Sequence, residues 1–255
     1  MIKKRLISSI ICKNGNVVQS FNYDNFLPLG SIESSIKNFN RWQVDEILIL
    51  SIDRYKKKLG PDFDLLNRIG KLNNETPIIY GGGISSVCEA KKTLELGADR
   101  IVLESITDEN FKIFREICEN VGSQSVILSL PLHLGLKNEV FFYDYKFKKQ
   151  KKISDNFKKA IMQNLVSEVL ITNYKNQGTM KGFNTKILKK IKFKKNFILN
   201  GGIHRKSSFD SLFKDKRVVA CAVGNNLNYE EHSIQEIKSN QYPKFFRKPN
   251  YNRKS

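Results

Sequence analysis

The 255-residue sequence is poor in the residues that build disulfide frameworks, zinc sites and membrane spans. Its four cysteines include no Cys-x-x-Cys pair, which argues against a disulfide framework or a zinc site. The three histidines stand far apart, so no metal or other cofactor is expected. No run approaches the roughly 20 apolar residues that a membrane span requires. Serines interrupt the apolar stretch behind the basic N-terminus, so no signal peptide is expected and a cytoplasmic protein is favoured.

Acidic residues are also few, with 25 Asp and Glu against 44 Lys and Arg and a formal charge of +19 at pH 7. Such an excess is one sign of a nucleic-acid partner. The lysines are spread over several segments, however, and no helix-turn-helix, RNA-recognition or zinc-finger pattern accompanies them. A basic surface that faces an acidic partner or anionic substrates is therefore the favoured interpretation.

Short apolar runs alternate with helix-like segments along the chain, which at 40% hydrophobic residues can bury a full core. Strands are expected at 5–11, 45–50, 77–80, 100–103, 125–130, 168–172, 196–199 and 218–223. Helices are expected at 32–42, 62–73, 85–96, 108–120, 154–165 and 184–191, with a long loop at 16–30 and a short exposed hairpin at 139–147. Eight strand–helix units in about 250 residues predict a (β/α)8 TIM barrel. We expect one barrel domain at 1–242 and a loosely held basic tail at 243–255.

Two glycine turns, about half a chain apart, close strand–helix units. Residues 81–83 are three glycines after an apolar run, and Gly201 and Gly202 repeat the pattern. Glycine lets backbone N–H groups approach a phosphate closely, although a single such turn fits a tight connection with no ligand equally well. Glu46 and Glu168 likewise stand at the same place in the second and sixth expected strands. This repeat favours a barrel of two similar halves over an open doubly wound sheet, which does not predict it.

With these patterns in place, the chain resembles the cyclase subunit of imidazole glycerol phosphate synthase along nearly its whole length. The likeness is carried by segments 13–18, 45–47, 81–84, 97–100, 122–124, 178–179 and 201–202. The resemblance implies a TIM barrel with a glutaminase subunit docked on its bottom face. Ammonia then passes up the barrel to a bisphosphorylated substrate at the top.

The residues that carry the family's chemistry are missing. The resemblance places catalytic aspartates at the tops of the first and fifth strands, where this sequence has Ile11 and Pro131. Neither side chain can transfer a proton. Two further positions that are acidic in the family hold Ser51 and Gln177 here, and the position of a loop lysine of the family holds Gln19. The nearest spare groups are Cys12, Asp53, Glu104 and His133, and their use would require a new mechanism.

The bottom face keeps its charges. The resemblance implies a ring of four residues that gates ammonia, here Arg5, Glu46, Arg100 and Glu168. Charges inside a barrel are costly unless they are paired, and both signs occur equally. A ring that only plugs the barrel and fixes strand register is the alternative. Two further positions, Asp99 and Gln124, match the bottom face that meets the glutaminase.

The implied phosphate sites are less complete. Their expected donors are Gly83 and Ser105 in the first half and Gly178, Gly202, Gly224 and Asn225 in the second. Glu104 stands beside the first site, where a carboxylate repels phosphate. We therefore expect an impaired first site and a partly competent second one.

Three functions are compatible with this sequence. The favoured one is a barrel without its cyclase site that binds a glutaminase and passes ammonia to a third enzyme. That enzyme would be an ATP-dependent sugar amidotransferase of surface-polysaccharide or nonulosonic-acid synthesis, bound to the top face. The others are an active cyclase of histidine biosynthesis with displaced acids, and a binding or scaffold protein. Whether the chain is itself an enzyme is left open.

Overall fold

A computed structural model describes residues 3–21, 23–72, 74–228 and 232–249. Within these ranges, eight parallel strands form a closed ring. The strands are β1 (Arg5–Lys13), β4 (Glu46–Ser51), β5 (Ile78–Gly81), β6 (Arg100–Leu103), β7 (Val126–Leu134), β10 (Glu168–Asn173), β11 (Asn196–Asn200) and β12 (Val218–Val223). The ring closes because β12 pairs with β1, where Leu6 lies opposite Cys221. The predicted TIM barrel is confirmed, and the open sheet is excluded because it would leave two edges unpaired.

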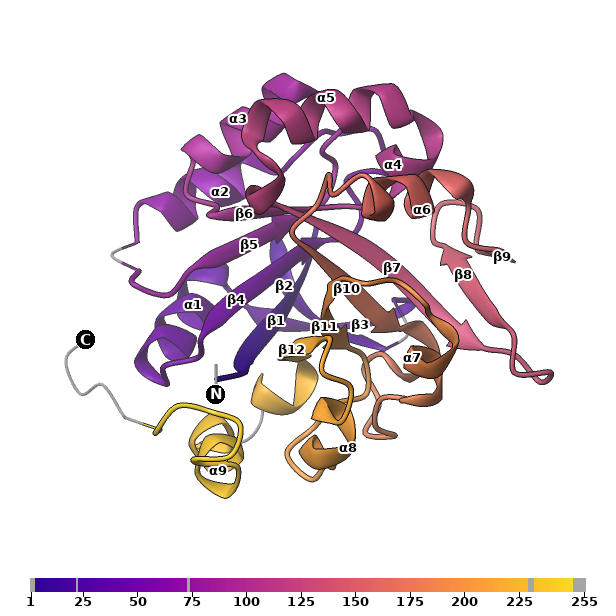
Figure 1. Cartoon of the computed structure of the whole chain (residues 1–255). Coiled ribbons are helices and arrows are strands. Elements are labelled where there is room, and N and C mark those ends of the chain that lie inside the picture. The colour runs from indigo at the N-terminus through magenta and orange to yellow at the C-terminus, as the bar shows by residue number, and fades with distance from the viewer. Residues whose placement is uncertain (1–2, 22, 73, 229–231, 250–255) are drawn as a thin grey trace.

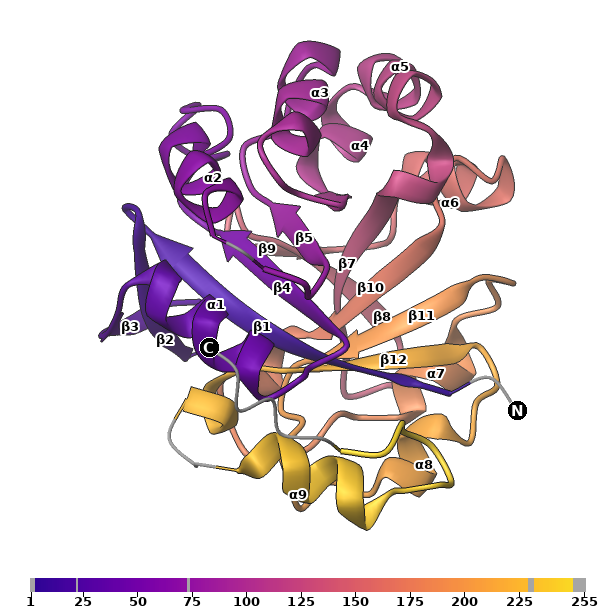
Figure 2. The ribbon, with the colours of Figure 1, turned by 90° about the vertical axis from the view of Figure 1, so that its left-hand side faces the viewer.

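Helices surround the barrel on its outer side (Figures 1 and 2). They are α1 (Ile32–Arg41), α2 (Phe63–Gly70), α3 (Val87–Glu95), α4 (Ser105–Glu109), α5 (Phe111–Val121), α6 (Asp155–Met162), α7 (Lys186–Lys190), α8 (Phe209–Phe213) and α9 (Ser233–Asn240). Ser31 and Ser86 cap α1 and α3 by accepting first-turn N–H groups. The single helix expected at 108–120 divides at Asn110, whose side chain accepts the Ile113 N–H and starts α5. Helices α8 and α9 lie in segments for which the sequence predicted none.

Two antiparallel hairpins extend the first and fifth strands of the ring at their C-terminal ends. β1 continues into β2 (Asn16–Phe21) and β3 (Asn25–Gly30), and β7 continues into β8 (Val140–Asp144) and β9 (Lys149–Lys151). The loop predicted at 16–30 was wrong, because Asn14 and Gly15 take positive φ and turn the chain back onto β1. The hairpin predicted at 139–147 extends further than expected, because its second strand, β9, lies at Lys149–Lys151. The matching positions of the hairpins agree with a barrel of two similar halves (Figure 1).

The core has an outer and an inner layer, because successive side chains of a strand point to opposite faces. The outer layer fills the space between the strands and the helices. The inner layer lies inside the ring and consists of Ile7, Leu48, Ile79, Val102, Ile127, Leu170, Ile198, Ala220 and Ala222. Each isoleucine or leucine contributes about 1.5–3 kcal/mol when fully buried. The middle of the barrel is therefore filled by apolar side chains.

The chain after α9 returns to the barrel. Phe246 is fully buried against Phe209 and Phe213, and the N–H of Lys4 donates to the carbonyl of Phe245. The predicted loose tail extends to residue 255, and 250–255 lie outside the described residues. Within the described ranges, no helix has the length and apolar character needed to cross a membrane.

Candidate functional site

Two arginines and two glutamates form a closed, alternating quartet at the N-terminal ends of the barrel strands. Arg5 contacts Glu46 at 3.2 Å and Glu168 at 2.6 Å. Arg100 contacts each of the same two glutamates at 2.7 Å. Each arginine thus bridges both carboxylates, and each carboxylate receives both arginines. We call these four residues the floor quartet.

The two carboxylates of the floor quartet differ in how they are paired. Glu168 accepts Arg5 on Oε1 and Arg100 on Oε2. Burial raises its pKa, but these contacts outweigh burial and leave the pKa below its usual value. Glu46 accepts both arginines on Oε1, and its buried Oε2 has no partner among the described residues. Burial therefore raises the pKa of Glu46 despite the two arginines.

Asp99 and Gln124 lie at the same end of the barrel, directly before β6 and β7, and both are exposed. The Asp99 carboxylate accepts the N–H of Ile78 at 2.7 Å. Asp99 therefore ties β5 to β6, a role that needs no partner protein. Contact of these two residues with a glutaminase stays a prediction.

Above the apolar interior, the inward-facing positions of five barrel strands become polar. Each lies two residues after a member of the inner layer and so points to the same side of its strand. We call these five residues the polar collar: Ser9, Glu104, Ser129, Thr172 and Asn200. Asn200 donates to the Thr172 hydroxyl at 3.3 Å. The barrel axis thus passes from charged floor through apolar interior to polar collar.

Glu104 is the carboxylate of the polar collar. It follows the last residue of β6, and its Oε2 accepts the Ser129 hydroxyl at 2.6 Å. Burial raises its pKa to about 7, although the Ser129 hydrogen bond acts in the opposite direction. Asp144 raises this pKa further and Lys151 lowers it. Glu104 therefore changes its charge near neutral pH.

Tyrosines from both hairpins lie beside the polar collar. The rings of Tyr23 and Tyr145 meet edge to face at 5.0 Å. Tyr145 also contacts Tyr143, which stacks on Tyr174 at 4.3 Å. Burial raises the pKa of Tyr23 and Tyr145, and the charge of Glu104 contributes to both shifts. These rings cover one side of the barrel mouth.

Both positions of the family's catalytic aspartates are buried and aprotic. Ile11 is 4% exposed, and Pro131 is buried in β7 opposite Thr172 of β10. Among the spare groups, burial raises the pKa of the Cys12 thiol to about 12. Burial lowers the pKa of His133. Neither change prepares these groups for proton transfer at neutral pH, whereas Glu104 is suited to it.

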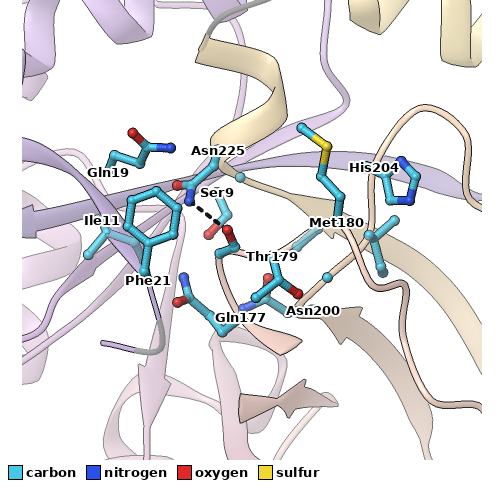
Figure 3. A pocket seen from close by; sticks show the side chains of 16 residues that line it. Ser9, Ile11, Gln19, Phe21, Gln177, Thr179, Met180, Asn200, His204 and Asn225 are labelled. Carbon is cyan, nitrogen blue, oxygen red and sulfur yellow. Dashed lines mark hydrogen bonds between the residues drawn. The ribbon is translucent and has the colours of Figure 1, made fainter. Parts of the chain in front are cut away.

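The second glycine turn opens into a pocket of about 360 Å³ that reaches the barrel mouth. Gly178, Gly202, Gly224 and Asn225 all line it, so the structure brings the four predicted residues of the second phosphate site together. Asn225 donates to the carbonyl of Gly178 at 3.4 Å (Figure 3). The described lining residues include no lysine, arginine, aspartate or glutamate. An anion bound here would depend on backbone, amide and hydroxyl donors and on the imidazole of His204, which also lines the pocket.

The first glycine turn packs closely against the rest of the chain. Gly83 packs directly beneath the carbonyl of Gly60, so this close approach needs a glycine. At the start of α3, the Glu89 carboxylate accepts the N–H and the hydroxyl of Ser85 at 2.8 and 2.9 Å. Both Ser85 donors are therefore engaged within the protein and are not available to an anion. Ser105, the other predicted residue here, begins the five-residue helix α4.

Sequence reasoning named Glu104 as a spare group but did not group it with the other four residues of the polar collar. The available signal was the period-two alternation from each inner-layer residue to the next inward position. The tyrosines lie on hairpins whose pairing with the barrel strands was not predicted. In the described residues, no group of three potential metal ligands comes together.

Comparison with known proteins gives one consistent result. The family described as "Histidine biosynthesis protein" matches residues 5–233. The chain is 26% identical over 235 residues to "Putative imidazole glycerol phosphate synthase subunit HisF" of Leptospira interrogans, covering 90% of this chain and 92% of the relative. It is 28% identical over 229 residues to "Putative imidazole glycerol phosphate synthase subunit hisF3" of Vibrio vulnificus, covering 88% of each.

A third relative carries the enzyme subunit's name without qualification. The chain is 26% identical over 242 residues to "Imidazole glycerol phosphate synthase subunit HisF" of a Hydrogenobaculum species. The match covers 94% of this chain and 96% of that relative. In all three cases the likeness therefore covers at least 88% of this chain.

Proposed function

Because the chain belongs to the histidine biosynthesis protein family, as a divergent HisF-like member, we propose that it conducts ammonia through its barrel without performing the cyclase reaction. A glutaminase bound to the floor would release ammonia, and an acceptor enzyme at the top face would use it. The observation that carries this proposal is the contrast between the two ends of the barrel. The charged floor is complete, while the two aspartate positions of the mouth are Ile11 and Pro131.

The interior favours a small neutral molecule over a charged one, and the apolar side chains that fill it have to shift to let that molecule pass. Between the floor quartet and the polar collar lie only apolar side chains of the inner layer, two of which are alanines, Ala220 and Ala222. An apolar passage opposes ammonium, whose charge is costly to remove from water, far more than it opposes neutral ammonia. The four ion pairs close the floor, so a movement of at least one arginine has to precede entry.

The mouth supports loss of the cyclase reaction. General acid–base catalysis requires a titratable group within hydrogen-bond reach of the substrate. Ile11 and Pro131 provide none, and Glu89 accepts the N–H and the hydroxyl of Ser85, which follows the first glycine turn. Two donors near that turn are therefore engaged before a bisphosphorylated substrate arrives.

The proposed acceptor is a sugar amidotransferase of surface-polysaccharide or nonulosonic-acid synthesis, and the proposed location is the cytoplasm. The two hairpins extend the strands beyond the mouth and present aromatic rings, among them Phe147, which is 59% exposed. Aromatic side chains are enriched in protein interfaces. The top face therefore suits a protein partner.

Two measurements test this function. Co-purification with a HisH-like glutaminase should give a stable heterodimer that an Asp99→Arg variant weakens. The complex, supplied with the family's bisphosphate substrate and ammonium chloride, should produce no imidazole glycerol phosphate. Formation of that product would establish the alternative, an active cyclase with displaced acids. Absence of any heterodimer would refute the ammonia conduit.

A further inference from the structure

The polar collar contains a carboxyl group that the family's chemistry does not explain. Glu104 continues the inward alternation of Arg100 and Val102 on β6. It is therefore the first ionisable group that a molecule meets after leaving the apolar interior. Its Oε2 accepts the Ser129 hydroxyl at 2.6 Å.

The neighbours of Glu104 suit a small hydrogen-bond donor. Hydroxyl oxygens of Ser9, Ser129 and Thr172 belong to the same collar, and each of these residues is at most 7% exposed. The Tyr145 hydroxyl, which is electrostatically coupled to Glu104, is buried and has no hydrogen-bond partner in the described structure. A buried hydroxyl without a partner is costly, and a ligand that donates to it would remove that cost.

We propose that Glu104 receives ammonia at the upper end of the barrel and holds it as ammonium within the polar collar. This proposal rests on the conduit function proposed above. The Glu104 carboxyl transfers its proton to the nitrogen lone pair of NH3, which forms NH4⁺ beside the carboxylate. When the nitrogen leaves for the acceptor, the proton returns to Glu104 and neutral NH3 departs. Atoms and charge balance without any further reactant.

The charges around Glu104 allow this exchange near neutral pH. Asp144 of β8 raises its pKa, Lys151 of β9 lowers it, and Tyr23 and Tyr145 face it from the two hairpins. Lys151 is itself paired with Asp108 at 2.6 Å and Asp144 at 2.7 Å. These two carboxylates therefore offset most of the electrostatic effect of Lys151 on Glu104. A carboxyl with a pKa near the working pH both gives and retakes a proton readily.

The test uses the chain alone with ammonium chloride as the probe. The apparent pKa of Glu104 is measured by NMR of 13C-labelled glutamate side chains, in ammonium, potassium or sodium chloride at equal ionic strength. Ammonium that binds the carboxylate lowers this pKa, by about 1 when it is present at about ten times its dissociation constant. Glu104→Gln identifies the resonance by its loss, and Glu95→Gln, at an exposed position on α3, is the matched control.

Thermal unfolding is a second measurement, and it does not require that the Glu104→Gln variant folds. Ammonium should raise the melting temperature of the wild-type chain above that in sodium or potassium chloride, and Glu95→Gln should respond in the same way. Equal pKa values of Glu104 in the three salts would overturn the proposal. An equal effect of potassium would also overturn it, because the site would then bind cations in general.

These outcomes are separable from those of the conduit function. Neither the NMR titration nor the melting experiment uses a glutaminase. A heterodimer without an ammonium effect at Glu104 would refute only the receiving role. An ammonium effect without a heterodimer would leave a collar that binds ammonium in a chain that does not conduct it from a glutaminase.

Discussion

Replacing Arg100 by methionine tests the energetic account of the floor quartet. Arg100 makes two contacts of 2.7 Å with carboxylates whose side chains are 9% and 10% exposed. Methionine fills part of the space but leaves Glu46 and Glu168 with Arg5 as their only arginine. Removing one partner of a buried ion pair costs about 3–5 kcal/mol. We expect about 3 kcal/mol, the lower end, because Arg5 still contacts both carboxylates.

Urea unfolding at neutral pH measures this loss, and thermal unfolding gives a second reading. For a chain of this length, about 3 kcal/mol corresponds to a melting temperature lower by roughly 6–12 °C. Arg100→Lys keeps the charge, so it should lose less stability than Arg100→Met. It should still be less stable than wild type, because lysine cannot reproduce the planar fork that bridges two carboxylates. Where its free energy of unfolding falls between those of wild type and Arg100→Met separates the contribution of charge from that of geometry.

The matched control is Arg115→Met on α5. Arg115 is exposed and donates to Gln163 at 2.7 Å, a surface contact expected to contribute within about 0.5 kcal/mol. If Arg100→Met and Arg115→Met unfold within about 0.5 kcal/mol of each other, the floor quartet does not hold the barrel together as argued here.

Three further substitutions give distinct outcomes. Burial raises the pKa of Glu104 from 4.5 to about 7, so its neutral form favours folding at low pH and about 3 kcal/mol is lost as pH rises through that range. Glu104→Gln should therefore gain about 3 kcal/mol relative to wild type between pH 4 and about pH 8, measured by urea unfolding. Gly202→Ala should destabilise more than Gly122→Ala. Both glycines have positive φ, but only at Gly202 would the new Cβ meet a carbonyl oxygen, at 2.6 Å. Phe246→Ala should cost about 3–5 kcal/mol, whereas Phe147→Ala, at an exposed ring, should cost little in thermal unfolding.

The barrel strands were predictable because each is buried on both faces. Such strands appear in the sequence as nearly continuous apolar runs, and those at 100–103 and 218–223 begin and end where expected. The hairpin at 16–30 was missed because its second strand carries Pro28 and is mostly exposed. Its turn was the better signal, since Asn14-Gly15 is a sequence typical of two-residue hairpin turns.

The candidate site also has a part that was predictable from the sequence and a part that was not. The residues of the floor quartet were named from family resemblance, and their alternating charge made mutual pairing a physical requirement. The inward direction of Glu104 follows from the period-two alternation of β6, although the residue lies one position beyond the strand. Its contact with Ser129 on the next strand of the ring was not predictable from local sequence. Its raised pKa depends on enclosure by residues distant in the chain.

The floor quartet and the polar collar are not equally strong evidence of function. Loss of one member of the floor quartet leaves a buried charge short of a partner, so mutation at any of the four is opposed by stability alone. Retention of the quartet therefore fits both a gate and a structural plug. Glu104 is different, because its ionised form opposes folding at neutral pH and glutamine would keep the Ser129 hydrogen bond without that cost. A carboxyl group that costs stability where an amide would not is better explained by a task at the barrel mouth than by the fold.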